Sequence, residues 1–127
     1  MYVLHIFTTD NFPGAIIIST PQDLALKDAV RGVSMFRKVS VPVLGMIQNM
    51  SVFICPHCSQ STHIFGSDGV QRECTKHDIR FLGDVPLHVS ICDNADNGRP
   101  TVVAEPDSDR AKAFLGIAVK VGEQIGL

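Results

Sequence analysis

Residues 15–47 read AIIISTPQDLALKDAVRGVSMFRKVSVPVLGMI, and this stretch decides the expected fold. Residues 15–18 form a continuous, mostly β-branched run, which is typical of a strand covered on both faces. Residues 19–23 form a polar turn rich in helix-starting residues. Apolar residues then recur at helical spacing, at Leu26, Ala29, Val30, Val33 and Phe36. Residues 41–47 predict a second strand, so the stretch is a strand–helix–strand unit with a parallel pair of strands.

The rest of the chain continues this alternation. Residues 68–77 predict a short helix, residues 81–86 a third strand, residues 89–97 a brief helix stopped by Gly98, and residues 99–103 an extended segment. A final helix is expected to begin near Asp107 and Ser108, and its inner face would carry Ala111, Phe114, Leu115, Ala118, Val121 and Ile125. The expected fold class is α/β, built from βαβ units with a mainly parallel sheet of three strands. Residues 1–127 are expected to form a single domain, in which residues 1–13 show no period that assigns them.

Ligands of open parallel sheets bind beyond the carboxyl ends of the strands. In this chain, residues 20–23, 49–58 and 86–88 are expected at that edge, because each segment follows or ends a predicted strand. The edge is therefore where a site is expected.

The most informative part of this edge is Cys55-Pro56-His57-Cys58, which follows the apolar run 52–54. Two cysteines three residues apart can direct both sulfurs at one metal centre, and thiolates are soft ligands that suit zinc or iron. A tetrahedral zinc site or a four-iron cluster needs about four ligands, so the pair supplies half of them.

Three interpretations of the cysteine pair stay open from the residues alone. A single-chain zinc site would recruit two of His63, Cys74 and His77. A redox dithiol is the second reading, although such a motif should open an amphipathic helix and the polar residues 59–62 do not predict one. The third is that the two cysteines are ordinary buried or surface thiols that bind nothing. Cys74 and Cys92 are expected to be helix-face residues, and His63 a hydrogen-bonding residue of the loop.

Composition limits the function further. The formal net charge is -2 and Trp is absent, which argues against nucleic acid as a main partner. No apolar run approaches the ~20 residues of a membrane span, and residues 1–7 lack the features of a secretory signal or transit peptide. The four cysteines are therefore expected to be reduced thiols or ligands, not a disulfide framework.

Six segments occur in the order that is found in one known family. They are STPQD at 19–23, VPVLG at 41–45, QNMS at 48–51, CPHC at 55–58, THIFG at 62–66 and LGDVPL at 82–87. From residue 14 onward the chain resembles the C-terminal half of the Mrp-type P-loop ATPases that carry iron–sulfur clusters, and most of all the mitochondrial branch that serves assembly of respiratory complex I.

The resemblance implies a deviant P-loop NTPase fold and a homodimer. In that dimer Cys55 and Cys58 of each copy would share one [4Fe–4S] cluster, which would then pass to apo iron–sulfur acceptor proteins such as complex I subunits. It also implies that Asn49 meets the adenine edge of bound ATP and that Pro86 lies against the base. The implied compartment is the mitochondrial matrix, with the cytoplasm as the alternative.

The chain departs from the family in one respect. The Gly-rich loop that ends in Gly-Lys-Ser/Thr and cradles the phosphates is absent, as are the acidic segments that hold magnesium. An incomplete fold without the N-terminal phosphate-loop strands is therefore expected, with residues 14–127 as its C-terminal half, and ATP hydrolysis by this chain alone is not expected. The alternative function is a structural zinc or interaction module without cluster transfer.

Overall fold

A computed structural model describes residues 2–5 and 13–127 of the chain. The elements are β1 (Tyr2–His5), β2 (Ala15–Ser19), α1 (Asp23–Lys38), β3 (Val43–Ile54), β4 (Ser61–Thr62), α2 (Gly69–His77), β5 (Phe81–Leu87), α3 (Val89–Asp96), α4 (Thr101–Ala104) and α5 (Asp109–Ile125). The expected α/β alternation is confirmed, including the helix at 68–77, the strand at 81–86 and the helix at 89–97. Among the described helices, none combines the length and apolarity that crossing a membrane requires.

The sheet has a parallel centre and antiparallel additions. Strand β3 pairs in parallel with β2 on one side and with β5 on the other. Strand β1 adds antiparallel to β2, and the two-residue β4 adds antiparallel to β3. The described sheet therefore has five strands, more than the three that the sequence predicted. Strand β1 falls in residues 1–13, where the sequence shows no period, while residues 1 and 6–12 lie outside the described residues.

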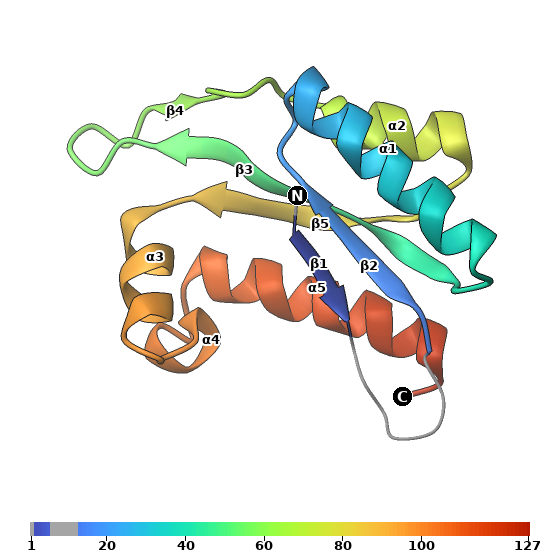
Figure 1. Cartoon of the computed structure of the whole chain (residues 1–127). Coiled ribbons are helices and arrows are strands. Elements are labelled where there is room, and N and C mark those ends of the chain that lie inside the picture. The colour runs from blue at the N-terminus through green and yellow to red at the C-terminus, as the bar shows by residue number, and fades with distance from the viewer. Residues whose placement is uncertain (1, 6–12) are drawn as a thin grey trace.

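Helices cover both faces of the sheet, as Figure 1 shows. Helices α1 and α2 lie on one face, and their core cluster consists of Ala15, Ile17, Leu26, Ala29, Val33, Phe36, Met46, Val70, Cys74 and Ile79. Helix α5 lies on the other face, over a cluster of Ile16, Leu44, Ile47, Leu82, Val85, Ile117 and Val121. Successive residues of β2 alternate between the two clusters, and β3 supplies Met46 to the first and Leu44 and Ile47 to the second, which explains why both strands are continuously apolar.

Strand β3 is longer than the predicted strand at 41–47, because it continues to Ile54. The two parts of the strand are joined by an irregularity at Met50, whose φ of 55° lies in the left-handed region. Asn49 pairs with Val85 and Phe53 pairs with Leu87, so four steps along β3 oppose two steps along β5. The strand accommodates this bulge without ending.

Two expectations in the C-terminal part were wrong. Residues 99–103 are not extended throughout, because Thr101–Ala104 form one helical turn in which the N–H groups of Val103 and Ala104 donate to the Pro100 carbonyl. In α5, Leu115 and Ala118 are exposed, and Ile117 is buried with Ala111 and Val121. The helix packs through Ile117, Phe114 three residues before it and Val121 four residues after it, so its inner face is rotated from the predicted one.

Candidate metal centre

The two candidate ligands lie at the tip of the β3–β4 hairpin. Phe53 pairs with Thr62 and Ile54 with Ser61, and the tip is closed by hydrogen bonds from Cys55 N–H to Gln60 O at 3.0 Å and from Ser59 N–H to Cys55 O at 2.9 Å. The hairpin projects from the edge of the sheet at which β3 and β5 end (Figure 1). The predicted position of the pair at this edge is therefore confirmed.

The turn gives the two thiols different surroundings. Cys55 is half-buried, whereas Cys58 is exposed. Hydrogen bonds from the backbone N–H of His57, from the backbone N–H of Cys58 and from the Cys58 side chain lower the pKa of Cys55. The last of these bonds places the Cys58 thiol next to that of Cys55. A lowered pKa favours the thiolate, which is the form that binds metals.

The structure does not bring the candidate zinc ligands to this pair. Cys74 lies on α2 and is buried in the core that this helix and α1 form with the sheet, and burial, with the Glu73 carboxylate as a smaller contribution, raises its pKa to about 11. His77 Nε2 lies 3.1 Å from a carboxylate oxygen of Glu73 on the same helix. Within residues 2–5 and 13–127, no group of three or more His, Cys, Asp or Glu side chains could hold a metal ion. Among these residues, the structure therefore forms no zinc site completed within one chain.

The remaining polar residues of the hairpin have structural partners. His63 Nδ1 lies 2.9 Å from the Ser51 carbonyl, so it donates to β3, and the expected role in shaping the loop is confirmed. Residues after Cys58 lead into β4 and not into a helix, which is unlike the helix expected after a redox dithiol. Cys92 is exposed on α3, where the Asp96 carboxylate, 3.7 Å from its sulfur, raises its pKa.

The two residues expected to contact a nucleotide lie at the same edge. Asn49 is half-buried beside the bulge, and its Oδ1 accepts a hydrogen bond of 3.0 Å from Met50 N–H. Pro86 lines a cleft of about 470 Å³ between the ends of β3 and β5 and the start of α5, together with Ser51, His88 and Arg110. In this structure the Asn49 side chain thus stabilises its own backbone, while Pro86 faces open space.

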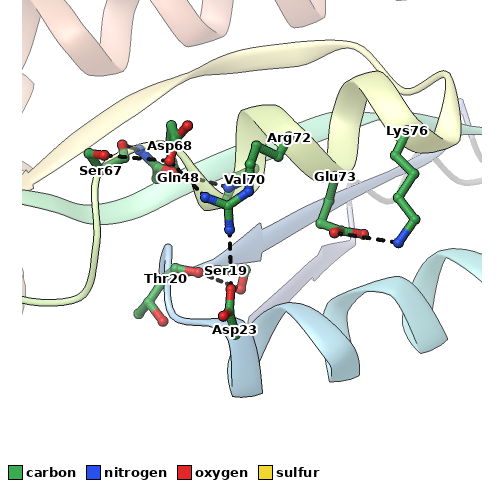
Figure 2. A network of polar contacts seen from close by, with 10 residues as sticks. All are labelled: Ser19, Thr20, Asp23, Gln48, Ser67, Asp68, Val70, Arg72, Glu73 and Lys76. Carbon is green, nitrogen blue, oxygen red and sulfur yellow. Dashed lines mark hydrogen bonds and ion pairs between the residues drawn. The ribbon is translucent and has the colours of Figure 1, made fainter.

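Gln48 is a residue of this edge that the sequence analysis missed. Its side chain is 2% exposed and donates to Ser67 O at 2.9 Å and to Asp84 Oδ1 at 2.8 Å, while Val70 N–H donates to its Oε1 at 3.1 Å. Figure 2 shows Gln48 between the loop that follows the hairpin and the start of α2. The available signal was a polar Gln directly after the apolar run of the predicted strand at 41–47.

The start of α2 is also fixed to the β2–α1 loop. A Cβ at Gly69 would lie 2.1 Å from the Pro21 carbonyl oxygen, so only glycine allows this approach. Arg72 bridges Asp68 at 2.8 Å and Asp23 at 3.2 Å (Figure 2). The β2–α1 loop and the segment that leads from the hairpin into α2 are therefore tied to each other.

A parallel α/β sheet whose central strand carries a two-cysteine loop beyond its carboxyl edge indicates the metal-binding proteins built on the P-loop NTPase fold. A family model for ParA, the NUBPL iron-transfer P-loop NTPases, matches residues 2–122, and the chain belongs to this family.

Individual relatives agree with this assignment. The mouse "Iron-sulfur cluster transfer protein NUBPL" is 56% identical over 115 residues, which cover 89% of this chain and 36% of the relative. The Arabidopsis thaliana "Iron-sulfur protein required for NADH dehydrogenase, mitochondrial" is 49% identical over 108 residues, covering 85% of this chain and 34% of the relative. The chain thus spans about a third of the length of these curated relatives.

A solved structure agrees as well. The nucleotide-binding protein from Archaeoglobus fulgidus, solved in complex with ADP, superposes with a TM-score of 0.63 at 31% identity, covering 81% of this chain and 41% of that protein. The expected α/β fold with a parallel sheet is therefore confirmed.

Proposed function

We propose that this chain carries an iron–sulfur cluster between two copies of itself and passes it to acceptor proteins. Cys55 and Cys58 of each copy would supply two thiolates, so that the dimer holds one [4Fe–4S] cluster with four sulfur ligands. The cluster is the cargo of the protein. The observation that carries the proposal is the paired thiols at an exposed hairpin tip, with no third ligand near them among the described residues.

The surroundings of the hairpin support a second copy as the source of the other ligands. Ile54 precedes the pair and is 41% exposed, and Ile64 follows the return strand and is 54% exposed. Large apolar side chains at an exposed tip favour contact with another protein surface. A symmetric contact would bring the same residues of both copies together, and with them both cysteine pairs.

Ligand exchange is the transfer chemistry that fits this site. Cys58 is exposed, so an acceptor thiolate can approach the iron atom to which it would be bound. In each exchange one iron–sulfur bond to the carrier breaks and one to the acceptor forms, without a change in oxidation state. With only two thiolates per copy, few exchanges separate the cluster from the carrier.

We also propose that Asn49 and Pro86 contact the adenine of a nucleotide at this edge. The cleft beside Pro86 has room for a base, and the Archaeoglobus fulgidus relative was solved with ADP. Because the chain has no Gly-Lys-Ser/Thr loop, the phosphates would add little, so adenosine and ATP should bind with similar, weak affinity. Titration calorimetry with both ligands, and with Asn49→Ala, tests this; tight binding of ATP alone would contradict it.

The acceptors and compartment follow the relatives' names. The Arabidopsis thaliana relative is named for NADH dehydrogenase and for mitochondria. We propose apo iron–sulfur subunits of respiratory complex I as acceptors, and the mitochondrial matrix as the compartment. Imaging of the tagged protein in its own cells would test the compartment, and a cytoplasmic signal would contradict it.

Anaerobic reconstitution tests the central proposal. The chain is incubated with ferrous iron and sulfide, and visible absorption, iron content and molar mass are measured. We expect cluster absorption, about two iron atoms per chain and a dimer. The double variant Cys55→Ala/Cys58→Ala should lose all three, whereas Cys92→Ala is the matched control because Cys92 is also exposed but lies on α3.

Two results would overturn the proposal. Iron retained by Cys55→Ala/Cys58→Ala would show that other residues hold it. One zinc ion bound per monomer, without visible absorption, would favour the alternative of a structural zinc module that transfers no cluster.

A further inference from the structure

The return segment of the hairpin, residues 61–68, lacks apolar packing. All of its residues are exposed except Phe65, which is half-buried. A segment that buries so little apolar area opens locally at low cost unless polar contacts hold it. The position of the cysteine loop therefore depends on the hydrogen bonds that tie this segment to β3.

These hydrogen bonds form a series that ends at Gln48. Nearest the tip are the backbone pairs of Phe53 with Thr62 and Ile54 with Ser61. His63 Nδ1 then donates to Ser51 O, and Gln48 Nε2 donates to Ser67 O at the base of the hairpin. The last of these is made by a fully buried side chain, and Val70, which donates to the same amide, is also fully buried, so at these two residues water competes little for the bonds.

Asp84 completes the coordination of the Gln48 amide. Gln48 Nε2 has two hydrogens, and its carboxamide bonds Ser67 O, Asp84 Oδ1 and Val70 N–H together. Asp84 belongs to β5, two residues before Pro86. The amide is thus fixed between the strand that leads to the proposed nucleotide cleft and the segment that returns from the cysteines.

We infer that Gln48 and Asp84 are a positioning pair that fixes the base of the cysteine hairpin and so controls how firmly the cluster is held. The pair binds no iron. It acts through Ser67 on the position of the hairpin that carries the two thiols. The inference rests on the proposed function for its link to the cluster, but the mechanical link from Gln48 to the hairpin can be measured without iron.

The test compares variants of the cluster-loaded chain. Gln48→Leu keeps the volume but removes every amide hydrogen bond, and release of iron to the chelator bathophenanthroline disulfonate should become about tenfold faster. Asp84→Leu should increase the rate of iron release by an intermediate factor. Asp84→Asn retains an acceptor oxygen, so its release should stay nearly as slow as that of the wild type. The visible circular dichroism of the cluster should change in Gln48→Leu and in Asp84→Leu and should stay close to that of the wild type in Asp84→Asn.

Ile117→Ala is the control for general destabilisation. Ile117 is buried on α5, on the opposite face of the sheet from α2, so its truncation lowers the melting temperature without touching the hairpin. If Ile117→Ala and Gln48→Leu, compared at equal distances below their melting temperatures, release iron at the same rate, the positioning role is refuted.

Amide hydrogen exchange separates this inference from the proposed function. In the iron-free chain, Gln48→Leu should raise exchange in residues 55–68 by about tenfold and leave that of α5 unchanged. If the wild-type chain takes up no cluster but this selective increase appears, the proposed function fails and the positioning role stands. If the hairpin exchanges at the wild-type rate in Gln48→Leu, the positioning role fails.

Discussion

The two halves of β3 are held in different ways. Its inner half, Val43 to Gln48, lies within the sheet between β2 and β5, and its side chains are buried on both faces. Its outer half, from Asn49 to Ile54, contains the Met50 bulge and leads out of the sheet. The residues of this half are half-buried or exposed, except Ser51, which is buried. Apolar packing therefore sets the stability of the fold, while a few polar contacts set the position of the thiols.

The largest expected effect comes from truncating one apolar residue in each half. Met46 is fully buried, so Met46→Ala should lower the free energy of unfolding by about 2–5 kcal/mol. Ile54 is 41% exposed, so Ile54→Ala should lower it by less than about 1 kcal/mol. Urea denaturation at neutral pH measures both. Equal losses would show that the outer half also belongs to the core.

The second comparison concerns a thiol of the core that contains the inner half and a thiol at the tip that follows the outer half. Burial raises the pKa of Cys74 from 9.0 to about 11, so its neutral form is favoured by folding. That contribution is complete below pH 9 and is lost as the pH rises toward about 11, because the unfolded chain releases this proton first. We expect a stability loss of up to about 2 kcal/mol over this window.

The measurement is denaturation at several alkaline pH values. Cys74→Ala should be less stable than the wild type at pH 7 and should lack this part of the alkaline loss. Cys55, whose pKa is lowered by the turn, should instead react with iodoacetamide at neutral pH while Cys74 does not. Modification of Cys74 before Cys55 would contradict the assignment of the two environments.

The smallest expected effect concerns the contact between the outer half and the return segment of the hairpin. His63→Ala removes the hydrogen bond to Ser51 O, which should cost about 1 kcal/mol locally and raise amide exchange in residues 61–67 about fivefold. Global stability should not change, because the segment is exposed. His57→Ala, at the exposed tip, is the matched control. A fall in global stability with His63→Ala would mean that the return segment is part of the cooperative core.

The inner half could be predicted from the sequence and much of the outer half could not. The continuous apolar runs and the helical spacing of Leu26, Ala29, Val33 and Phe36 are local signals of burial, and they predicted β2, α1 and the start of β3. Strand β4 has two exposed residues and no apolar alternation, so nothing in its composition distinguishes it from a loop. Its existence follows from pairing with β3.

The site shows the same division. Cys55 and Cys58 were evident from their spacing, because the chemistry of a ligand pair is local. Gln48 was not evident, since its partners Ser67 and Asp84 lie 19 and 36 residues away. A buried polar side chain is identified only when the groups that satisfy it are known. The exposed face of α5 was misjudged for a related reason, because several helical phases fit its many apolar residues.

The bulge at Met50 has a consequence for anyone who transplants or shortens this strand. Because four steps on β3 oppose two on β5, β3 has two surplus residues, and the bulge takes them up. The cysteine loop therefore starts about 6–7 Å closer to the body of the molecule than it would on a regular strand of the same length. Deleting one surplus residue would turn every later side chain to the opposite side of the ribbon, whereas deleting both would keep the facing and leave Phe53 opposite Leu87. The side of the ribbon on which the two sulfurs lie thus depends on whether the number of surplus residues is even, independent of which side chains occupy the bulge.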